Sequence, residues 1–198
     1  KNGNLWVGTE RRGLLKYSHG VLTAVSGGNL PQSVLALADD VDCLWLGTQK
    51  GISKMDYSTG RIKHYKPFDN EDKDNRVVTI YRSMSGDIYV ATTVGVMRYV
   101  RESDNFLMVP GLVGITMEHM SENSRGILWL ASYSTGVYEY DLSDGCVRNH
   151  YSPQTGSEQI PDMISSICID NADNTWVIGF SSGFFRYHYV KSEFQTYS

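Results

Sequence analysis

The chain has 198 residues, of which 41% are apolar and 20% are charged, a balance that excludes a disordered chain and suits one sizeable domain with its own core. The formal net charge is −4 and the sequence has no basic stripe, which argues against a nucleic acid as a partner. It also has no apolar run of about 18 residues and no signal peptide, so we expect no direct membrane insertion by this segment.

Strand-forming residues and turn formers dominate the sequence. Aromatic residues make up 12% of it, with 13 Tyr, and the 19 Gly are spread along its length. No segment shows a sustained helical period. The three cysteines, Cys43, Cys146 and Cys168, have neither C-x-x-C nor Cys/His metal spacing. We interpret them as free or buried thiols and predict no cofactor and no metal.

The first predicted strand contains a motif that recurs along the chain. Residues 4–9 read N-L-W-V-G-T, and residues 44–48 read L-W-L-G-T. Further copies follow at residues 87–92, 127–132 and 174–179. The aromatic anchors of the five copies are Trp6, Trp45, Tyr89, Trp129 and Trp176. Subtracting successive positions gives separations of 39, 44, 40 and 47 residues, near the spacing of about 40–50 residues typical of propeller blades.

A second motif follows each anchor after a short turn. It is a glycine, an apolar residue, one free position, a charged residue and then Tyr or Met. The five glycines are Gly13, Gly51, Gly95, Gly136 and Gly183, and the charged residues are Lys16, Lys54, Arg98, Glu139 and Arg186. Agreement of five copies at several positions establishes a sequence repeat.

Each repeat unit is predicted to contain four short strands. In the second unit these are residues 44–48, 52–57, 61–65 and 76–81, separated by glycine-containing turns and one longer connection. The last of them is a connecting strand that leads into the next unit. Its counterparts are predicted at residues 34–38, 115–118 and 164–169.

A unit of four strands cannot bury both of its faces alone, and radial stacking of such units gives a β-propeller. We therefore predict an all-β chain, a β-propeller of four-stranded antiparallel blades with the aromatic anchors between blades. The expected blade repeats cover about residues 1–43, 44–87, 88–126, 127–174 and 175–198. A β-sandwich is the alternative architecture, but it does not require five copies of one motif.

The order of the motifs resembles a known repeat family. Residues 29–34, N-L-P-Q-S-V, precede an acidic turn at residues 38–40 and then L-W-L-G-T. This order is similar to the two-component regulator propeller repeat, which runs L-P-x-x-x-V, an acidic turn, L-W-x-G-T and G-[L/I]-x-x-[Y/F]. The resemblance covers the whole chain and is weaker at Tyr89 and Ala91 and where Ile178 replaces the usual glycine. WD40 repeats fit less well because their Gly-His and Trp-Asp pairs are absent.

The resemblance implies a biological context. Such repeats typically form the periplasmic, extracytoplasmic sensor of hybrid two-component systems in gut bacteria, where paired propellers precede an immunoglobulin-like domain, a membrane helix and a histidine kinase. It implies that this segment is not itself an enzyme. It also implies that the segment recognises an oligosaccharide or another small ligand and signals to the kinase, with the remaining propeller blades and the downstream sensor domains as partners.

The strand count indicates an incomplete ring. The first three strands of a unit are predicted five times, whereas the connecting strand is predicted four times. We therefore expect a partial ring of about five blades. Because an open ring exposes strand edges and an apolar blade face, we expect it to associate with the missing blades or to form a homodimer.

No catalytic constellation is evident in the sequence. His64 and His150 each precede a Tyr at the same repeat position, which favours a structural role. Most carboxylates fall in predicted turns, where Asp bonds its own backbone. These are Asp39, Asp40, Asp69, Glu71, Asp72, Asp141, Asp144, Asp170 and Asp173. The sequence contains no G-x-S-x-G elbow, phosphate-binding loop or EF-hand calcium loop.

Binding is better supported than catalysis. Ligands of propellers usually contact loops on one face, and the turns before the repeat glycines vary while their framework does not. We predict Arg11, Arg12, Lys50 and Tyr133 as ligand-binding residues, with Tyr133 stacking on a sugar and the cations contacting acidic groups. The connections at residues 66–75 and 152–161 are expected on the same face. Variation of this kind also fits an unconstrained surface.

Three functions from different classes therefore remain open. The first is a sensor propeller that binds an oligosaccharide. The second is a structural or dimerisation propeller without a small-molecule ligand, and the third is a propeller lyase or glycosidase. A membrane helix and a kinase encoded downstream would discriminate the first from the others.

Overall fold

The computed structural model describes residues 4–27, 29–66, 75–156, 160–161 and 163–197. Within these ranges the chain forms nineteen strands and one short 3-10 turn. The strands are β1 (Leu5–Thr9), β2 (Gly13–Ser18), β3 (Val21–Ala24), β4 (Ala36–Asp39), β5 (Cys43–Thr48), β6 (Gly51–Asp56), β7 (Ile62–Tyr65), β8 (Val77–Arg82), β9 (Ile88–Thr92), β10 (Gly95–Val100), β11 (Asn105–Val113), β12 (Met117–Glu122), β13 (Ile127–Ser132), β14 (Gly136–Asp141), β15 (Cys146–Tyr151), β16 (Ile164–Ile169), β17 (Thr175–Gly179), β18 (Gly183–His188) and β19 (Glu193–Tyr197), and the turn is η1 (Pro153–Thr155).

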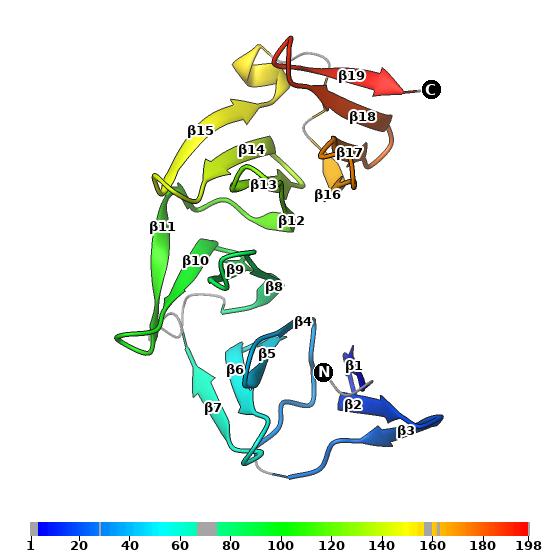
Figure 1. The fold of residues 1–198 in the computed structure, drawn as a ribbon, viewed down its shortest axis with the longest axis vertical. Coiled ribbons are helices and arrows are strands. Elements are labelled where there is room, and N and C mark those ends of the chain that lie inside the picture. Colours follow the sequence, from blue (N-terminus) through cyan, green and yellow to red (C-terminus); the bar gives the residue numbers. More distant parts are fainter. Residues whose placement is uncertain (1–3, 28, 67–74, 157–159, 162, 198) are drawn as a thin grey trace.

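The strands form five antiparallel sheets that follow one another along the chain (Figure 1). Blade 1 is β1–β3, blade 2 is β4–β7, blade 3 is β8–β11, blade 4 is β12–β15 and blade 5 is β16–β19. The blades fan out in an arc with β4, β8, β12 and β16 on its inner side, and each of these strands contacts the next one. The prediction of an all-β propeller with four-stranded antiparallel blades, in a partial ring of about five, is confirmed; blade 1 has three strands among the described residues.

The sheets divide the chain at different points from the expected repeat units. Each connecting strand pairs with the strand of the following aromatic anchor, as Ala38 does with Trp45 and Cys168 with Trp176. A unit such as residues 44–87 therefore combines three strands of one blade with the inner strand of the next. The reason is that the longer connection, and not the tight turn, carries the chain from the outside of one blade to the inside of the following blade.

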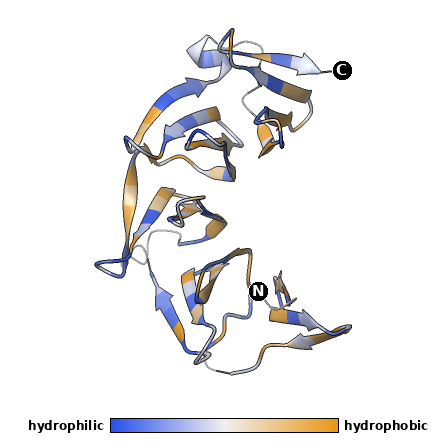
Figure 2. Cartoon of the chain, viewed as in Figure 1, coloured by the Kyte–Doolittle hydropathy of each residue, from blue (hydrophilic) through white to orange (hydrophobic). Residues whose placement is uncertain are grey.

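The aromatic anchors lie between blades. The Trp45 ring, with 0% of its surface exposed, packs against Tyr99 and Phe106 of blade 3, with ring centroids 4.7 and 5.7 Å away. Trp129 of blade 4 packs in the same way against Tyr187 of blade 5 at 4.8 Å. Burial of such rings removes a large apolar area from water. Each blade thus completes its core with side chains of its neighbour, while the turns stay mainly hydrophilic (Figure 2).

Two glycines of the repeat are required by close packing. A Cβ on Gly47 would lie 2.5 Å from Cγ1 of Val77, which is on the inner strand of blade 3. Gly136 has a φ of 90°, and a Cβ there would lie 2.1 Å from the carbonyl oxygen of Tyr151. A larger residue would strain the backbone at Gly136 and displace blade 3 at Gly47. The G-T motif therefore sets the distance between blades.

A buried carboxylate joins blades 2 and 3. The Asp40 side chain is fully buried and accepts hydrogen bonds from Arg82 Nε (3.0 Å) and Arg101 Nη2 (3.1 Å), both of blade 3. It also accepts from the Val41 backbone N–H (2.8 Å) and from Trp45 Nε1 (3.4 Å). Burial alone would raise the pKa of Asp40, but these donors outweigh burial and hold its pKa below the ordinary value.

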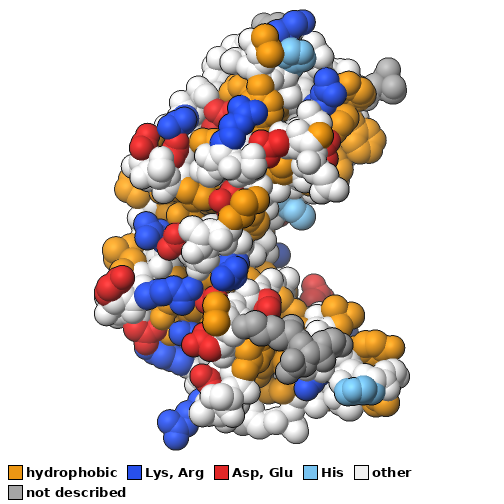
Figure 3. Space-filling view, viewed as in Figure 1, with side chains coloured by type: hydrophobic (Ala, Val, Ile, Leu, Met, Phe, Trp, Pro, Cys, Tyr) orange, Lys and Arg blue, Asp and Glu red, His pale blue; other side chains and the backbone are white. Residues whose placement is uncertain are grey.

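The two end blades expose apolar side chains (Figure 3). On blade 1 these are Leu5, Val21 and Leu22, and on blade 5 they are Phe180, Phe184 and Tyr197. The anchor Trp176 of blade 5 is only partly buried, whereas Trp45 and Trp129 are fully buried by the blade that follows them. The outer face of blade 5 is therefore the face that, in blades 2 and 4, packs against a neighbour.

Removal of an inter-blade anchor tests the packing. Replacement Trp45→Ala should lower the free energy of unfolding by about 3–5 kcal/mol, because it leaves a cavity shared by two blades. Val190→Ala, which shortens a side chain that is 91% exposed, serves as the control and should change this free energy by no more than about 0.5 kcal/mol. Urea unfolding followed by tryptophan fluorescence measures both. Equal losses in the two variants would contradict the inter-blade role.

Replacement Asp40→Asn tests the link between blades 2 and 3. Because the folded-state pKa of Asp40 is depressed, its carboxylate stabilises the fold above the unfolded pKa of about 3.9, and this contribution is lost as the pH falls through the lower folded value. At pH 7 we expect the variant to be about 2–3 kcal/mol less stable than the wild type. The difference should shrink between about pH 5 and about pH 2 in urea unfolding curves. A difference that does not change with pH would refute this assignment.

Candidate functional site

The hydroxyl of the motif threonine closes the turn before each of the first three repeat glycines. In blade 1, Thr9 Oγ1 donates to the Gly13 carbonyl and accepts from the Arg12 N–H, both at 2.9 Å. In blade 2, Thr48 Oγ1 accepts from the Lys50 N–H at 3.0 Å. These bonds fix the turn backbone, so the residues between threonine and glycine are held in place, and in blades 1 and 2 their side chains are exposed. This explains why the turn sequence can vary on a constant frame.

The predicted ligand-binding residues lie in these turns and are exposed. Arg11 and Arg12 belong to blade 1, Lys50 to blade 2 and Tyr133 to blade 4. The structure does not gather them into one pocket. In the described part of the chain, none of them lines the cleft beside Trp6, the cleft beside Glu139 or the cleft beside Asn29. In the two longer connections, residues 67–74 and 157–159 lie outside the described residues, as do Asp69, Glu71 and Asp72.

Tyr133 forms an exposed aromatic pair with a residue that the sequence analysis missed. Its ring meets that of Phe180 edge to face, with centroids 5.7 Å apart. Tyr133 is 42% exposed and Phe180 is 63% exposed, and Met163, also exposed, accepts the Phe180 backbone N–H at its carbonyl (2.9 Å). Tyr133 directly follows β13 and Phe180 directly follows β17, the strands that carry the anchors of blades 4 and 5, so the two residues occupy the same repeat position. An alignment of that position across the repeats would have found Phe180.

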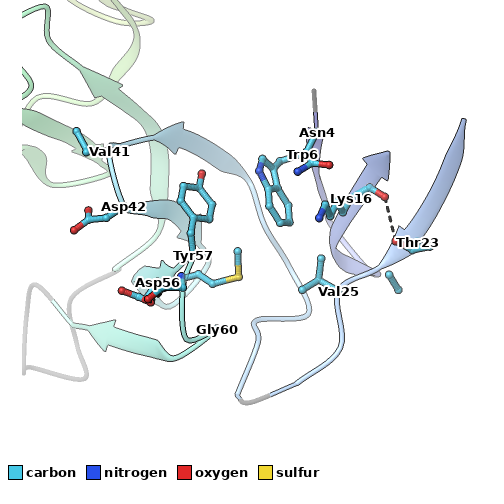
Figure 4. A pocket seen from close by; sticks show the side chains of 13 residues that line it. Asn4, Trp6, Lys16, Thr23, Val25, Val41, Asp42, Asp56, Tyr57 and Gly60 are labelled. Atoms are coloured by element: carbon cyan, nitrogen blue, oxygen red, sulfur yellow. Dashed lines mark hydrogen bonds between the residues drawn. The ribbon is translucent and has the colours of Figure 1, made fainter. Parts of the chain in front are cut away.

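A cleft of about 620 Å³ lies between blades 1 and 2 (Figure 4). Its walls include Trp6 and Tyr57, whose rings are nearly parallel, with an interplanar angle of 19° and centroids 6.1 Å apart. Val25 contributes an apolar surface, and Asn4 and Asp42 contribute polar groups. Aromatic walls with a few polar groups suit a ligand that has both an apolar face and hydroxyl groups. None of the four predicted ligand-binding residues lines this cleft.

Two titratable side chains of this cleft, Asp56 and Tyr57, form hydrogen bonds within the fold. Asp56 accepts hydrogen bonds from Ser58 and Thr59, which lower its pKa to about 2. Burial, and then the hydrogen bond that its hydroxyl donates to Asp39, raise the pKa of the Tyr57 phenol. A general acid or base works best with a pKa near the operating pH. These two groups therefore suit binding and not proton transfer at neutral pH.

One group of described residues has metal-ligand spacing, formed by Asp40, Asp42 and Cys43. Asp40 is already held by two arginines of blade 3. Burial raises the pKa of the Cys43 thiol to about 12, which keeps it protonated, whereas a metal ligand must be a thiolate. This arrangement does not suit a metal ion.

The two histidines at the same repeat position bond within their own blades. His64 Nδ1 lies 2.9 Å from Ser53 Oγ, its cross-strand neighbour. His150 stacks on Tyr138, its cross-strand neighbour, with centroids 4.0 Å apart, and its Nε2 contacts the Thr135 carbonyl at 2.5 Å. Both rings therefore support the strand pair and the turn beside it.

No protein-family model matches this chain, and no curated protein matches it in sequence. Solved structures do match. The extracellular domain of a proposed hybrid two-component system, BT4673 of B. thetaiotaomicron, has a TM-score of 0.79 and 21% identity over 98% of this chain and 26% of that chain. The corresponding domain of BT3049 has a TM-score of 0.74 and 20% identity over 91% and 24%.

A third similar structure is that of virginiamycin B lyase from Staphylococcus aureus, with a TM-score of 0.75 and 17% identity over 100% of this chain and 67% of the lyase. The fold is that of a β-propeller. The chain spans about a quarter of the length of the two extracellular domains, 26% and 24%. No helix in the described part of the chain is both long and apolar enough to cross a membrane.

Proposed function

We propose that this chain is a ligand-sensing part of the extracytoplasmic, periplasmic region of a hybrid two-component sensor. The observation that carries the proposal is the likeness to the extracellular domain of BT4673, with a TM-score of 0.79 over 98% of this chain. The motif order of the two-component regulator propeller repeat supports it independently. In such a sensor the segment is not an enzyme, and a histidine kinase elsewhere in the protein receives the signal.

The ligand that we propose is an oligosaccharide, bound on the aromatic pair of Tyr133 and Phe180. Exposed aromatic rings offer flat apolar surfaces on which sugar rings stack, and the two rings come from neighbouring blades. The polar turn residues around them provide hydrogen-bonding groups for hydroxyls. Arg11, Arg12 and Lys50 lie in other blades and would meet only the distant parts of an extended ligand, including acidic ones.

Signalling would follow from differential binding. A ligand shifts an equilibrium between two arrangements of a receptor only by the difference between its affinities for them. A glycan that contacts both Tyr133 of blade 4 and Phe180 of blade 5 favours the arrangement in which these two blades are packed as described here. The same bound arrangement would then favour one state of the kinase.

Calorimetric titration with a panel of plant and host oligosaccharides tests the proposal on the complete gene product. We expect one glycan to bind, and Tyr133→Ala and Phe180→Ala each to weaken it roughly tenfold, since a stacked ring contributes about 1–1.5 kcal/mol. Phe184→Ala is the matched control, because it removes another exposed ring of blade 5 outside the pair. It should leave the affinity unchanged.

The other outcomes separate the alternatives. Binding that is lost in Trp6→Ala but kept in Phe180→Ala would move the ligand to the cleft between blades 1 and 2. Release of a shortened or unsaturated glycan during the titration would indicate a lyase or glycosidase. Absence of heat with every glycan would refute the oligosaccharide and leave the sensor role to another ligand.

A role in assembly is the second candidate function. The exposed side chains of Leu22 on blade 1 and Phe184 on blade 5 favour it, because large exposed apolar patches mark interaction surfaces. The partners would be further blades of the same protein or a second copy of it. Sedimentation of the complete gene product distinguishes a homodimer from a monomer in which further blades cover these faces.

A further inference from the structure

One repeat position places a charged side chain directly opposite the aromatic anchor. The pairs are Trp6 with Lys16, Trp45 with Lys54, Tyr89 with Arg98, Trp129 with Glu139 and Trp176 with Arg186. In blade 2, Lys54 Nζ lies 5.2 Å from the Trp45 ring centroid and 5.4 Å from that of Tyr99 in the next blade. Lys16 and Arg186 lie over their anchors in the same way, at 5.6 and 5.8 Å. A cation thus lies over the anchor ring in blades 1, 2 and 5 and is paired opposite the anchor in blade 3.

Blade 4 breaks the rule with an acid. Glu139 is 8% exposed and lies opposite Trp129, where the other blades have Lys or Arg. Its carboxylate accepts hydrogen bonds from Asn149 Nδ2 and from the Tyr151 hydroxyl, but none of the ion pairs within the described residues includes it. Burial raises the pKa of Glu139. A buried carboxylate without a counter-charge destabilises the fold unless something compensates it.

Glu139 lines a pocket of about 320 Å³ between blades 4 and 5. Asn123, Asn149 and Tyr189 line it as well and bring oxygen atoms that accept hydrogen bonds. Its two cations, Arg125 and Arg148, lower the pKa of Glu139 but do not offset its burial, because each forms its ion pairs with other carboxylates. Those partners are Asp173 at 3.6 Å for Arg125, and Asp141 and Asp144 for Arg148. Arg125 also covers the Tyr189 ring at 4.0 Å.

Within the ranges that the structure describes, the aromatic anchor of blade 4, Trp129, also lacks the hydrogen-bond acceptor that two other anchors have. The indole N–H groups of Trp45 and Trp176 donate to Asp40 and Asp170, at 3.4 and 2.8 Å. The residue in the position of Asp170 in blade 4 is Asn123, which instead donates its Nδ2 to the Tyr189 hydroxyl at 3.2 Å. Trp129 Nε1 is buried and has no hydrogen-bond partner among the described residues. Both exceptions of blade 4, Glu139 and Asn123, therefore face the same pocket.

We propose that this pocket binds the primary ammonium group of a small ligand, held by the Glu139 carboxylate. Blade 2 contains a comparable arrangement, because the ammonium group of Lys54 lies near the aromatic rings of two neighbouring blades. In blade 4 the ligand supplies the cation that the repeat itself lacks. The remaining ammonium hydrogens donate to the oxygens of Asn149 and Tyr189, and the ion pair compensates a charge that the fold buries.

This site is separate from the aromatic pair proposed to bind an oligosaccharide. Asn123 and Arg125 precede β13, whereas Tyr133 follows it, so the two sites lie at opposite ends of the strands of blade 4. The inference does not rest on the proposed function. An amino sugar and a simple alkylamine would both satisfy the pocket, and the titration is arranged to distinguish them.

The test uses two pairs of probes on the complete gene product, butylamine against butanol and glucosamine against glucose. We expect the amine of at least one pair to bind at neutral pH and its alcohol or neutral sugar to bind at least about tenfold more weakly, as judged by titration calorimetry at millimolar ligand. Glu139→Gln should weaken amine binding at least about tenfold. Glu102→Gln, an exposed acid of blade 3, is the matched control and should have no effect.

A second variant keeps the proposal testable if Glu139→Gln folds poorly. Glu139→Lys restores the cation of the other blades, so it should unfold at a temperature no lower than the wild type and should not bind amines. Butylamine and glucosamine both failing to bind the wild type would overturn the proposal. Equal binding of amine and neutral partner, or amine binding that survives in both Glu139 variants, would overturn it as well. Preference for glucosamine over butylamine would identify the ligand class as an amino sugar.

Discussion

Blades 2, 3 and 4 of this protein each bury their aromatic anchor by packing it against rings of the next blade. Trp45 is covered by Tyr99 and Phe106 of blade 3, and Trp129 by Tyr187 of blade 5. A single blade would leave these rings in water, so the blades have to fold and pack together. The spacing of the blades is then dictated by the glycine of the G-T motif, since a Cβ at Gly47 would collide with Val77 of the next inner strand.

Polar side chains also connect neighbouring blades. Asp40 of blade 2 accepts from Arg82 and Arg101 of blade 3. In the other direction, Asp104 of blade 3 accepts from the Tyr65 hydroxyl of blade 2 at 2.7 Å and pairs with Lys63. Such partly exposed charge pairs contribute less to stability than the buried rings. Their effect is to fix the orientation of one blade on the next, because a carboxylate with several donors has only one good geometry.

The sequence predicted those parts of the structure that every blade repeats. The aromatic anchors and the second glycine recur at a nearly constant spacing, and a motif that recurs five times reports a structural requirement. It could not show that each connecting strand joins the following sheet, because strand pairing between units depends on how the longer connection crosses from one blade to the next. It also missed Phe180, which shares the repeat position of Tyr133, because the contact between the two rings across neighbouring blades is visible only in the structure.

The repeats provide an internal reference against which the exceptions can be judged. Tyr133 and Phe180 are exposed rings at a turn position that is polar in blades 1 to 3. Glu139 replaces the cation found beside the other anchors, and Asn123 replaces the aspartate found beside Trp45 and Trp176. All four concern the boundary between blades 4 and 5. The motifs that the five repeats share explain why blades 4 and 5 pack together. They do not explain why these four positions differ from the other blades. On the two proposals above, a ligand at either end of β13 contacts the boundary between blades 4 and 5, so we expect binding at one end to favour the packing that the other end requires.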